Sequence, residues 1–87
     1  MSQSTPPPLT VYIVDDDAAM RDSTVLLLGL QGYRTACFAS AEDFLAAWHD
    51  DWHGCVVADL KLPGKSGIEM LKALRARGTA IPLLIVT

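Results

Sequence analysis

Two groups of carboxylates follow apolar segments of this sequence and could together bind a cation. Asp15, Asp16 and Asp17 come directly after one apolar run of four residues, and Asp59 comes directly after another. If both runs are strands of one parallel sheet, their carboxyl ends deliver these acids to the same edge. Carboxylate oxygens are preferred ligands of Mg²⁺, and a carboxylate beside the ion is a nucleophile that can accept a phosphoryl group. We therefore expect the chemistry of the chain at these two strand ends.

The four aspartates are expected to have different roles. Mg²⁺ takes about six oxygen ligands, usually one or two carboxylates, a carbonyl and several waters. Asp16 and Asp59 would supply the carboxylates, and Asp15 would bind through water or adjust the local charge. Asp17 is interpreted as the N-cap of the helix that follows, because aspartate is favoured there. Asp59 precedes a turn-rich loop over residues 60–67 and has no helix to cap.

The elements that must position these acids alternate regularly. Ser40 is a helix N-cap candidate, with Asp43 three residues later, and Gly32 and Gly78 stand where helices end. Short connections between alternating strands and helices favour a parallel α/β sheet with helices on both faces. The sequence predicts strands at 9–14, 33–38, 55–58 and 82–86, and helices at 17–31, from 40 and at 67–77.

Apolar periodicity predicts which side of each helix is buried. The first helix is ambiguous, because residues 23–30 carry no charge. Its outer apolar side is either an exposed partner surface or part of a broad buried face. The inward side chains are predicted to be Met20, Thr24, Leu27 and Leu28 in the first helix, Phe44, Leu45 and Trp48 in the second, and Ile68, Leu71 and Leu74 in the third.

Composition narrows the class of protein. The 87 residues, about half of them apolar, suit one small domain over residues 9–87, preceded by a loose proline-rich tail over 1–8. Ten acids against seven bases give a net charge of −3, which argues against direct contact with nucleic acid. No apolar run approaches the ~20 residues of a membrane span. Cys37 and Cys55 are interpreted as buried free thiols in a reducing compartment, so we expect a cytoplasmic protein.

A second candidate metal site lies between the second helix and the third strand, where His49 and His53 stand four residues apart. A helical histidine pair needs a third ligand directed at the same point, and none is evident. We therefore expect both histidines to be solvated and the neighbouring Trp48 and Trp52 to lie partly on the core.

From about Thr10 to its last residue, the chain resembles the receiver domains of two-component response regulators. The motifs that carry the resemblance are Ile-Val-Asp-Asp-Asp at 13–17, Asp-Leu-Lys-Leu-Pro-Gly-Lys-Ser-Gly at 59–67 and Ile-Val-Thr at 85–87. The amino-acid segment at 40–45 is most similar to that of nitrogen-fixation-type regulators. The resemblance implies a flavodoxin-like, doubly wound parallel sheet with strand order 2-1-3-4.

The resemblance also implies a function. Asp59 would be the phosphoacceptor, served by a histidine kinase or phosphotransfer domain, and the module itself would not be an enzyme. Mg²⁺ would be bound by Asp15, Asp16, Asp59 and the backbone carbonyl of Lys61. Thr87 would be the switch hydroxyl that contacts a phosphoryl oxygen after transfer. The phosphoryl signal would pass to a DNA-binding output domain, and the first helix would be the docking site of the kinase's phosphohistidine domain.

The family pattern continues beyond Thr87 with a helix, a fifth strand that carries a lysine, and a final helix. We therefore expect either that this sequence is a truncated part of a longer regulator or that its fourth-strand edge pairs with another chain, as in a homodimer. Two other functions stay open. Haloacid-dehalogenase-like phosphotransferases place a nucleophilic aspartate after a first strand, as Asp15 could be, with a second acid at the position of Asp17. A module that binds partners without phosphorylation is the other.

Overall fold

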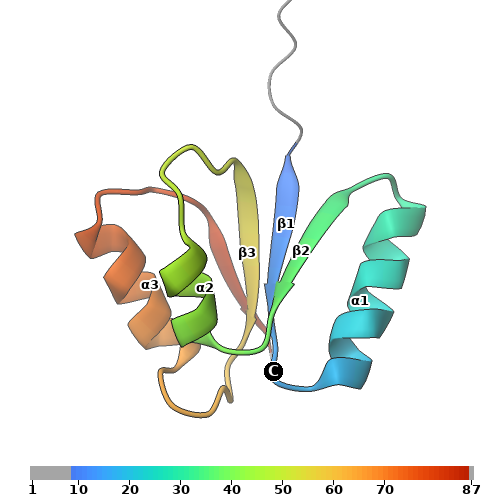
Figure 1. Cartoon of the computed structure of the whole chain (residues 1–87), viewed down its shortest axis with the longest axis horizontal. Coiled ribbons are helices and arrows are strands. Elements are labelled where there is room, and N and C mark those ends of the chain that lie inside the picture. The colour runs from blue at the N-terminus through green and yellow to red at the C-terminus, as the bar shows by residue number, and fades with distance from the viewer. Residues whose placement is uncertain (1–8, 87) are drawn as a thin grey trace, which may run out of the picture.

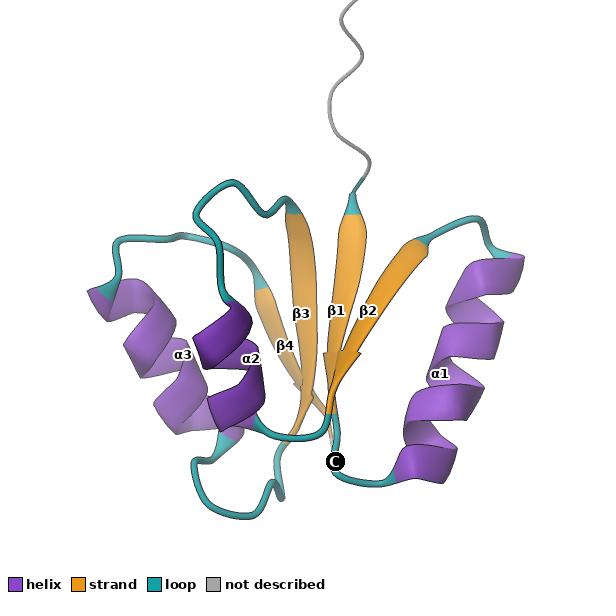
Figure 2. Ribbon diagram, in the orientation of Figure 1, coloured by secondary structure: helices purple, strands orange, loops and turns teal. Residues whose placement is uncertain are grey.

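The structure, a computed structural model, describes residues 9–86 as four strands and three helices in strict alternation (Figures 1 and 2). The predicted tail at 1–8 and Thr87 lie outside the described residues. The elements are β1 (Thr10–Val14), α1 (Ala18–Leu30), β2 (Arg34–Phe38), α2 (Ala41–Ala47), β3 (Gly54–Asp59), α3 (Gly67–Ala76) and β4 (Leu83–Val86). The predicted boundaries are correct to within one residue for most elements, since the flanking residues act as caps or turns.

The sheet is parallel throughout, and its strand order is β2-β1-β3-β4, as predicted. Helix α1 covers one face beside β2, whereas α2 and α3 lie together on the other face (Figures 1 and 2). This arrangement brings the carboxyl ends of β1 and β3 together in the middle of the sheet. Among the described residues, no helix is long and apolar enough to cross a membrane.

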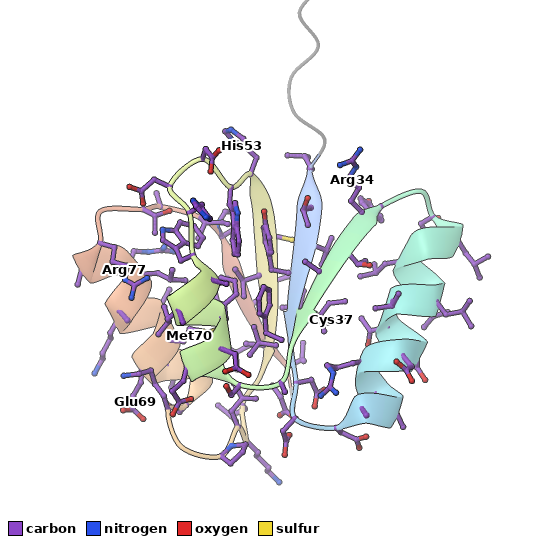
Figure 3. All side chains as sticks on the ribbon, in the orientation of Figure 1. Arg34, Cys37, His53, Glu69, Met70 and Arg77 are labelled. Carbon is purple, nitrogen blue, oxygen red and sulfur yellow. The ribbon has the colours of Figure 1, made fainter. Side chains whose placement is uncertain are left out.

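The main core lies between the sheet and the pair α2 and α3. Its five largest fully buried side chains are Phe44, Met70, Leu74, Val14 and Val56, and Figure 3 shows Met70 in this layer. An aromatic group extends the core toward the amino-terminal edge of the sheet. Because a phenol and an indole expose large apolar surfaces, their stacking stabilises this end of the fold. The Tyr12 and Trp52 rings stack with centroids 4.6 Å apart, and Trp48 packs edge-on against Trp52 at 5.4 Å.

The side of helix α1 that faces the sheet matches the prediction only in part, since Thr24 and Leu28 are half-buried as predicted. Met20 and Leu27, both predicted to be inward, are 53% and 65% exposed, and α1 has no fully buried residue. The half-buried stripe is instead Arg21, Thr24, Val25 and Leu28, which also follows helical spacing. Five apolar residues among 25–30 fit several rotations of the helix equally well, so periodicity could not fix its phase. Of the two interpretations of the outer apolar side of this helix, the exposed one is correct, because Leu26, Leu27 and Leu30 are all exposed.

Helix α3 begins with a complete capping box. Ser66 Oγ accepts a hydrogen bond from the Glu69 amide at 3.1 Å, and the Glu69 carboxylate accepts one from the Ser66 amide at 3.1 Å. Met70 and Leu74 are fully buried and Leu71 is half-buried. The prediction that Ile68 faces inward is wrong, because Ile68 is 48% exposed. Ser40 caps α2, as predicted, by accepting from the Asp43 amide.

The cysteines are free, but the prediction that both are buried is wrong. Cys37 is exposed and Cys55 is half-buried. Both lie on the sheet face that α1 covers only in part, and Cys37 is on the edge strand β2 (Figure 3). An apolar strand pattern predicts an inward side, whereas burial also depends on what covers that side.

Candidate functional site

Three carboxylates meet at the carboxyl end of the sheet. Oxygens of Asp15, Asp16 and Asp59 all lie within 4.8 Å of one another. The register explains this, since Val14 at the end of β1 pairs with Ala58 in β3. The residues that follow therefore leave neighbouring strands side by side, and the predicted convergence of these acids is confirmed.

Backbone hydrogen bonds fix the turn that follows β1. Asp15 Oδ1 accepts from the Asp17 amide at 2.9 Å, and the Asp15 amide donates to the Phe38 carbonyl at 3.1 Å. Arg21 reaches back from α1 and donates from Nη1 to the Asp15 carbonyl at 2.7 Å. Asp17 is not part of the cluster and instead caps α1, accepting from the Ala19 amide at 2.9 Å. The N-cap role predicted for Asp17 is thus confirmed.

Asp59 is the last residue of β3 and is half-buried. Its Oδ1 accepts from the Lys61 amide at 2.9 Å, so the carboxylate is held at the start of the loop over 60–66. The Leu60 amide donates to the Val86 carbonyl at 2.8 Å, which connects the loop to β4. Within the loop, the Leu62 side chain is buried. The acid is therefore oriented by the loop that follows it.

The three carboxylates form a donor set suited to a small, hard cation. Negative groups this close repel one another, and a divalent ion between them would relieve the repulsion while taking oxygen ligands of the kind that Mg²⁺ prefers. One oxygen of Asp15 and one of Asp59 accept backbone amides, which leaves the second oxygen of each carboxylate for a ligand. The acidic site thus fits Mg²⁺ by its chemistry.

The predicted lysine, threonine and histidine assignments have different outcomes. The Lys61 side chain is exposed, and its carbonyl stays a predicted ligand. Thr87 lies outside the described residues. His49 and His53 are exposed, and Figure 3 shows His53 near the start of β3, at the far edge from the acids. Within residues 9–86, no other cluster of three or more metal-ligating side chains occurs.

One contact at the site was missed by sequence reasoning. Glu42, in the first turn of α2, accepts a hydrogen bond from the Lys65 amide at 3.2 Å through Oε2. An acid in a first helical turn is explained by the helix dipole alone. No sequence signal therefore pointed to a bond between α2 and the loop after β3.

Comparison with known proteins identifies the family. The family model of the response regulator receiver domain matches residues 11–87. The transcriptional regulatory protein FixJ of Bradyrhizobium diazoefficiens is 46% identical over 77 residues, which are 88% of this chain and 38% of FixJ. The C4-dicarboxylate transport transcriptional regulatory protein DctR of Rhodobacter capsulatus is 39% identical over 90% of this chain and 41% of DctR. The chain thus spans about two-fifths of the length of these relatives.

Comparison with solved structures leads to the same family. Full-length FixJ from B. japonicum superposes with a TM-score of 0.83 at 45% identity, covering 90% of this chain and 38% of that one. The response regulator StyR gives a TM-score of 0.87 at 37% identity, covering 91% of this chain and 40% of StyR. Neither comparison supports the haloacid-dehalogenase alternative. The acidic edge, the fold and these matches together place the chain in the family of response regulator receiver domains.

Proposed function

We propose that this chain accepts a phosphoryl group on Asp59. The observation that carries the proposal is the convergence of Asp15, Asp16 and Asp59 within 4.8 Å at the carboxyl end of a parallel sheet. In phosphoryl transfer, catalysis consists mostly of positioning and charge neutralisation, so the reaction needs only a carboxylate nucleophile beside a cation site. The Lys61 amide orients the Asp59 carboxylate, and the family resemblance selects Asp59 as the acceptor within the trio.

The proposed step is a displacement at phosphorus. A carboxylate oxygen of Asp59 forms a bond to the phosphorus of a phosphohistidine, and the phosphorus–nitrogen bond breaks. The electron pair of that bond returns to the imidazole, and Asp59 becomes an acyl phosphate. With acetyl phosphate as donor, the phosphorus–oxygen bond breaks instead and acetate leaves. The phosphoryl group stays on the chain, so the module is proposed to be an acceptor and not an enzyme.

Mg²⁺ is proposed to be held by Asp16 and Asp59 directly, by the Lys61 carbonyl, and by Asp15 through water. When bound, the ion supplies positive charge that offsets the negative charge of the acids and of the incoming phosphoryl group. Asp15 and Asp59 are each fixed by a backbone amide, which prepares the site before the ion arrives. Thr87 is proposed as the switch hydroxyl on the strength of the family resemblance.

The proposed donor is a histidine kinase or phosphotransfer domain in the cytoplasm, and the proposed receiver of the signal is an output domain. The exposed apolar side of α1 supports a docking role for this helix. Leu26, Leu27 and Leu30 are 64%, 65% and 73% exposed, and no charged residue separates them. Apolar side chains gathered on one helix face are typical of a partner surface.

A homodimer through β4 is the second partner that we propose. β4 is an edge strand within the described sheet, and its Leu84 and Val86 are 59% and 48% exposed. A two-fold axis perpendicular to the sheet would pair two β4 strands in antiparallel fashion and bring these side chains together. The outward backbone groups and the apolar side chains would then be covered by one contact.

The chemical nature of the product tests the proposed function. Treatment with acetyl phosphate and Mg²⁺ should give a phosphoryl group that hydroxylamine removes, as expected of an acyl phosphate, and a chelator should prevent labelling. Hydroxylamine-resistant label would reject a carboxylate acceptor. A phosphatase assay separates the haloacid-dehalogenase alternative, because turnover that Asp15→Asn abolishes and Asp59→Asn leaves intact would favour an Asp15 enzyme.

A further inference from the structure

Glu42 makes an unusual long-range contact beside the site. Among the side-chain hydrogen bonds of the described residues, all but two join positions at most six apart. One exception is the 3.2 Å bond from the Lys65 amide to Glu42 Oε2, which spans 23 positions. It connects the first turn of α2 with the loop between β3 and α3.

This bond holds the middle of the loop over 60–66, between the hydrogen bonds that hold its start and its end. At its start, the Lys61 amide is bonded to Asp59, and at its end the Ser66 amide is bonded to Glu69. Between them the backbone turns through Gly64, whose φ is +72°. Glu42 lies directly over that turn, since a Cβ added at Gly64 would be 2.7 Å from Glu42 Oε2. The side chain thus packs on the glycine while it accepts from the next residue.

The loop held by Glu42 is also the one that shapes the acceptor site. Its Lys61 amide donates to the Asp59 carboxylate, and its Lys61 carbonyl is the proposed third protein ligand of the cation. If the middle of the loop were released, the positions of both groups would become less well defined. Groups that orient metal ligands without touching the metal commonly change metal affinity when they are mutated.

We propose that Glu42 is a positioning residue, which holds the loop over 60–66 in the conformation that presents the Lys61 carbonyl and the Asp59 carboxylate. The inference rests on the proposed function for its consequence in cation binding. Its structural part concerns only the loop. Glu42 couples α2 to the acceptor site through a single carboxylate that never contacts the reacting atoms.

The chain offers a matched control. Asp43 is the neighbouring acid in the first turn of α2, is exposed like Glu42, and makes no side-chain hydrogen bond to the loop among the described residues. Asp43→Ala removes the same favourable charge from the helix start as Glu42→Ala does. Glu42→Gln retains an acceptor oxygen for the Lys65 amide and removes only the charge. The three variants separate the loop contact from the stability of α2.

The first measurement is Mg²⁺ titration by calorimetry on the 87-residue chain. Glu42→Ala should raise the Kd for Mg²⁺ about 3–10-fold, the size of effect expected when one ordinary, solvent-exposed hydrogen bond that orients the ligands is lost. Glu42→Gln should stay within about twofold of the unsubstituted chain, and Asp43→Ala should match it. Equal weakening by Glu42→Ala and Asp43→Ala, or no weakening by Glu42→Ala, would overturn the proposal.

The second measurement needs no metal. Amide hydrogen exchange, resolved by NMR in a chelator, should speed up at both Lys65 and Lys61 in Glu42→Ala and at neither in Asp43→Ala. Acceleration at Lys65 alone would show that the contact does not reach the acceptor, and would overturn the proposal. If the unsubstituted chain fails to bind Mg²⁺ while exchange spreads to Lys61, the proposed function fails and the positioning role of Glu42 stands.

Discussion

The carboxylates of Asp16 and Asp59 lie within 4.8 Å of each other, although one follows β1 and the other ends β3. Their proximity is a product of the parallel pairing of these two strands, which ends at Val14 and Ala58. Such an arrangement of like charges is unfavourable in isolation. It is therefore a site where binding of a cation should have a measurable effect on stability.

Millimolar Mg²⁺ is predicted to stabilise the fold. A ligand that binds only the folded state at ten times its Kd contributes about 1.4 kcal/mol, which corresponds to roughly 5–10 °C in Tm for a domain of this size. Thermal unfolding with and without Mg²⁺ measures the shift. Asp16→Asn should abolish it, and Asp51→Asn, an exposed acid outside the cluster, should leave it unchanged. An intact response in Asp16→Asn would reject the metal assignment.

Gly54 is predicted to be essential to the fold. It begins β3 with φ +138°, and a Cβ there would collide with the backbone carbonyl of Thr10. Gly54→Ala should destabilise the chain by about 1–3 kcal/mol or more. Gly29→Ala is the control, because Gly29 lies within α1 with open space around it, and should stabilise by about 0.5–1 kcal/mol. Urea unfolding measures the midpoint of each variant. If both midpoints moved in the same direction, the close approach of Gly54 to the Thr10 carbonyl would be contradicted.

How much of this could be predicted from sequence depends on the kind of information involved. A parallel sheet and the meeting of Asp15 with Asp59 at its edge follow from alternating elements and the rules of parallel sheets, so they were predictable, whereas the strand order came from the family resemblance. The rotation of α1 was not, because Met20 and Leu27 fit an apolar stripe as well as Val25 does. A periodic pattern shows that a helix has an inner side, but a uniformly apolar segment leaves that side undefined.

Other features were mispredicted or missed for a second reason, which is that they depend on contacts between elements and not on the pattern within one element. Ile68 fits the inward spacing of α3, but the buried residues of this helix are Gly67, Met70 and Leu74, and Ile68 lies outside that stripe. Cys37 belongs to an apolar strand, but it is on the edge strand β2. The bond between Glu42 and Lys65 joins a helix and a loop that no local rule connects. Each depends on tertiary packing, which sequence periodicity does not encode.

The capping box of α3 is predicted to make stability depend on pH in acid. The hydrogen bond from the Ser66 amide lowers the pKa of Glu69 below its ordinary value of 4.5. A carboxylate with a lowered folded-state pKa contributes stability that is present above the unfolded-state pKa and is lost as pH falls through the folded one. The difference in unfolding midpoint between the unsubstituted chain and Glu69→Gln should therefore be larger at pH 7 than at pH 3. A gap that is equal at both pH values would contradict this assignment, and Asp22→Asn serves as the control.

The edge strand β4 is predicted to cause self-association of the 87-residue chain. Sedimentation velocity should show dimers or larger species as concentration rises. Leu84→Lys places a charge on the exposed edge and should shift the chain toward monomer. Leu26→Lys is the matched control, since Leu26 is equally apolar and 64% exposed but lies on α1, and should leave association in place. A compact, cooperative monomer of the unsubstituted chain at high concentration would refute the β4 dimer.

The central claim is that Asp59 accepts the phosphoryl group, and peptide mapping tests it most directly. The chain is treated with acetyl phosphate and Mg²⁺, digested at acidic pH, and analysed by tandem mass spectrometry. We predict one phosphoryl group, on Asp59, and its loss in Asp59→Asn. A label on Asp15, or undiminished labelling of Asp59→Asn, would contradict the account.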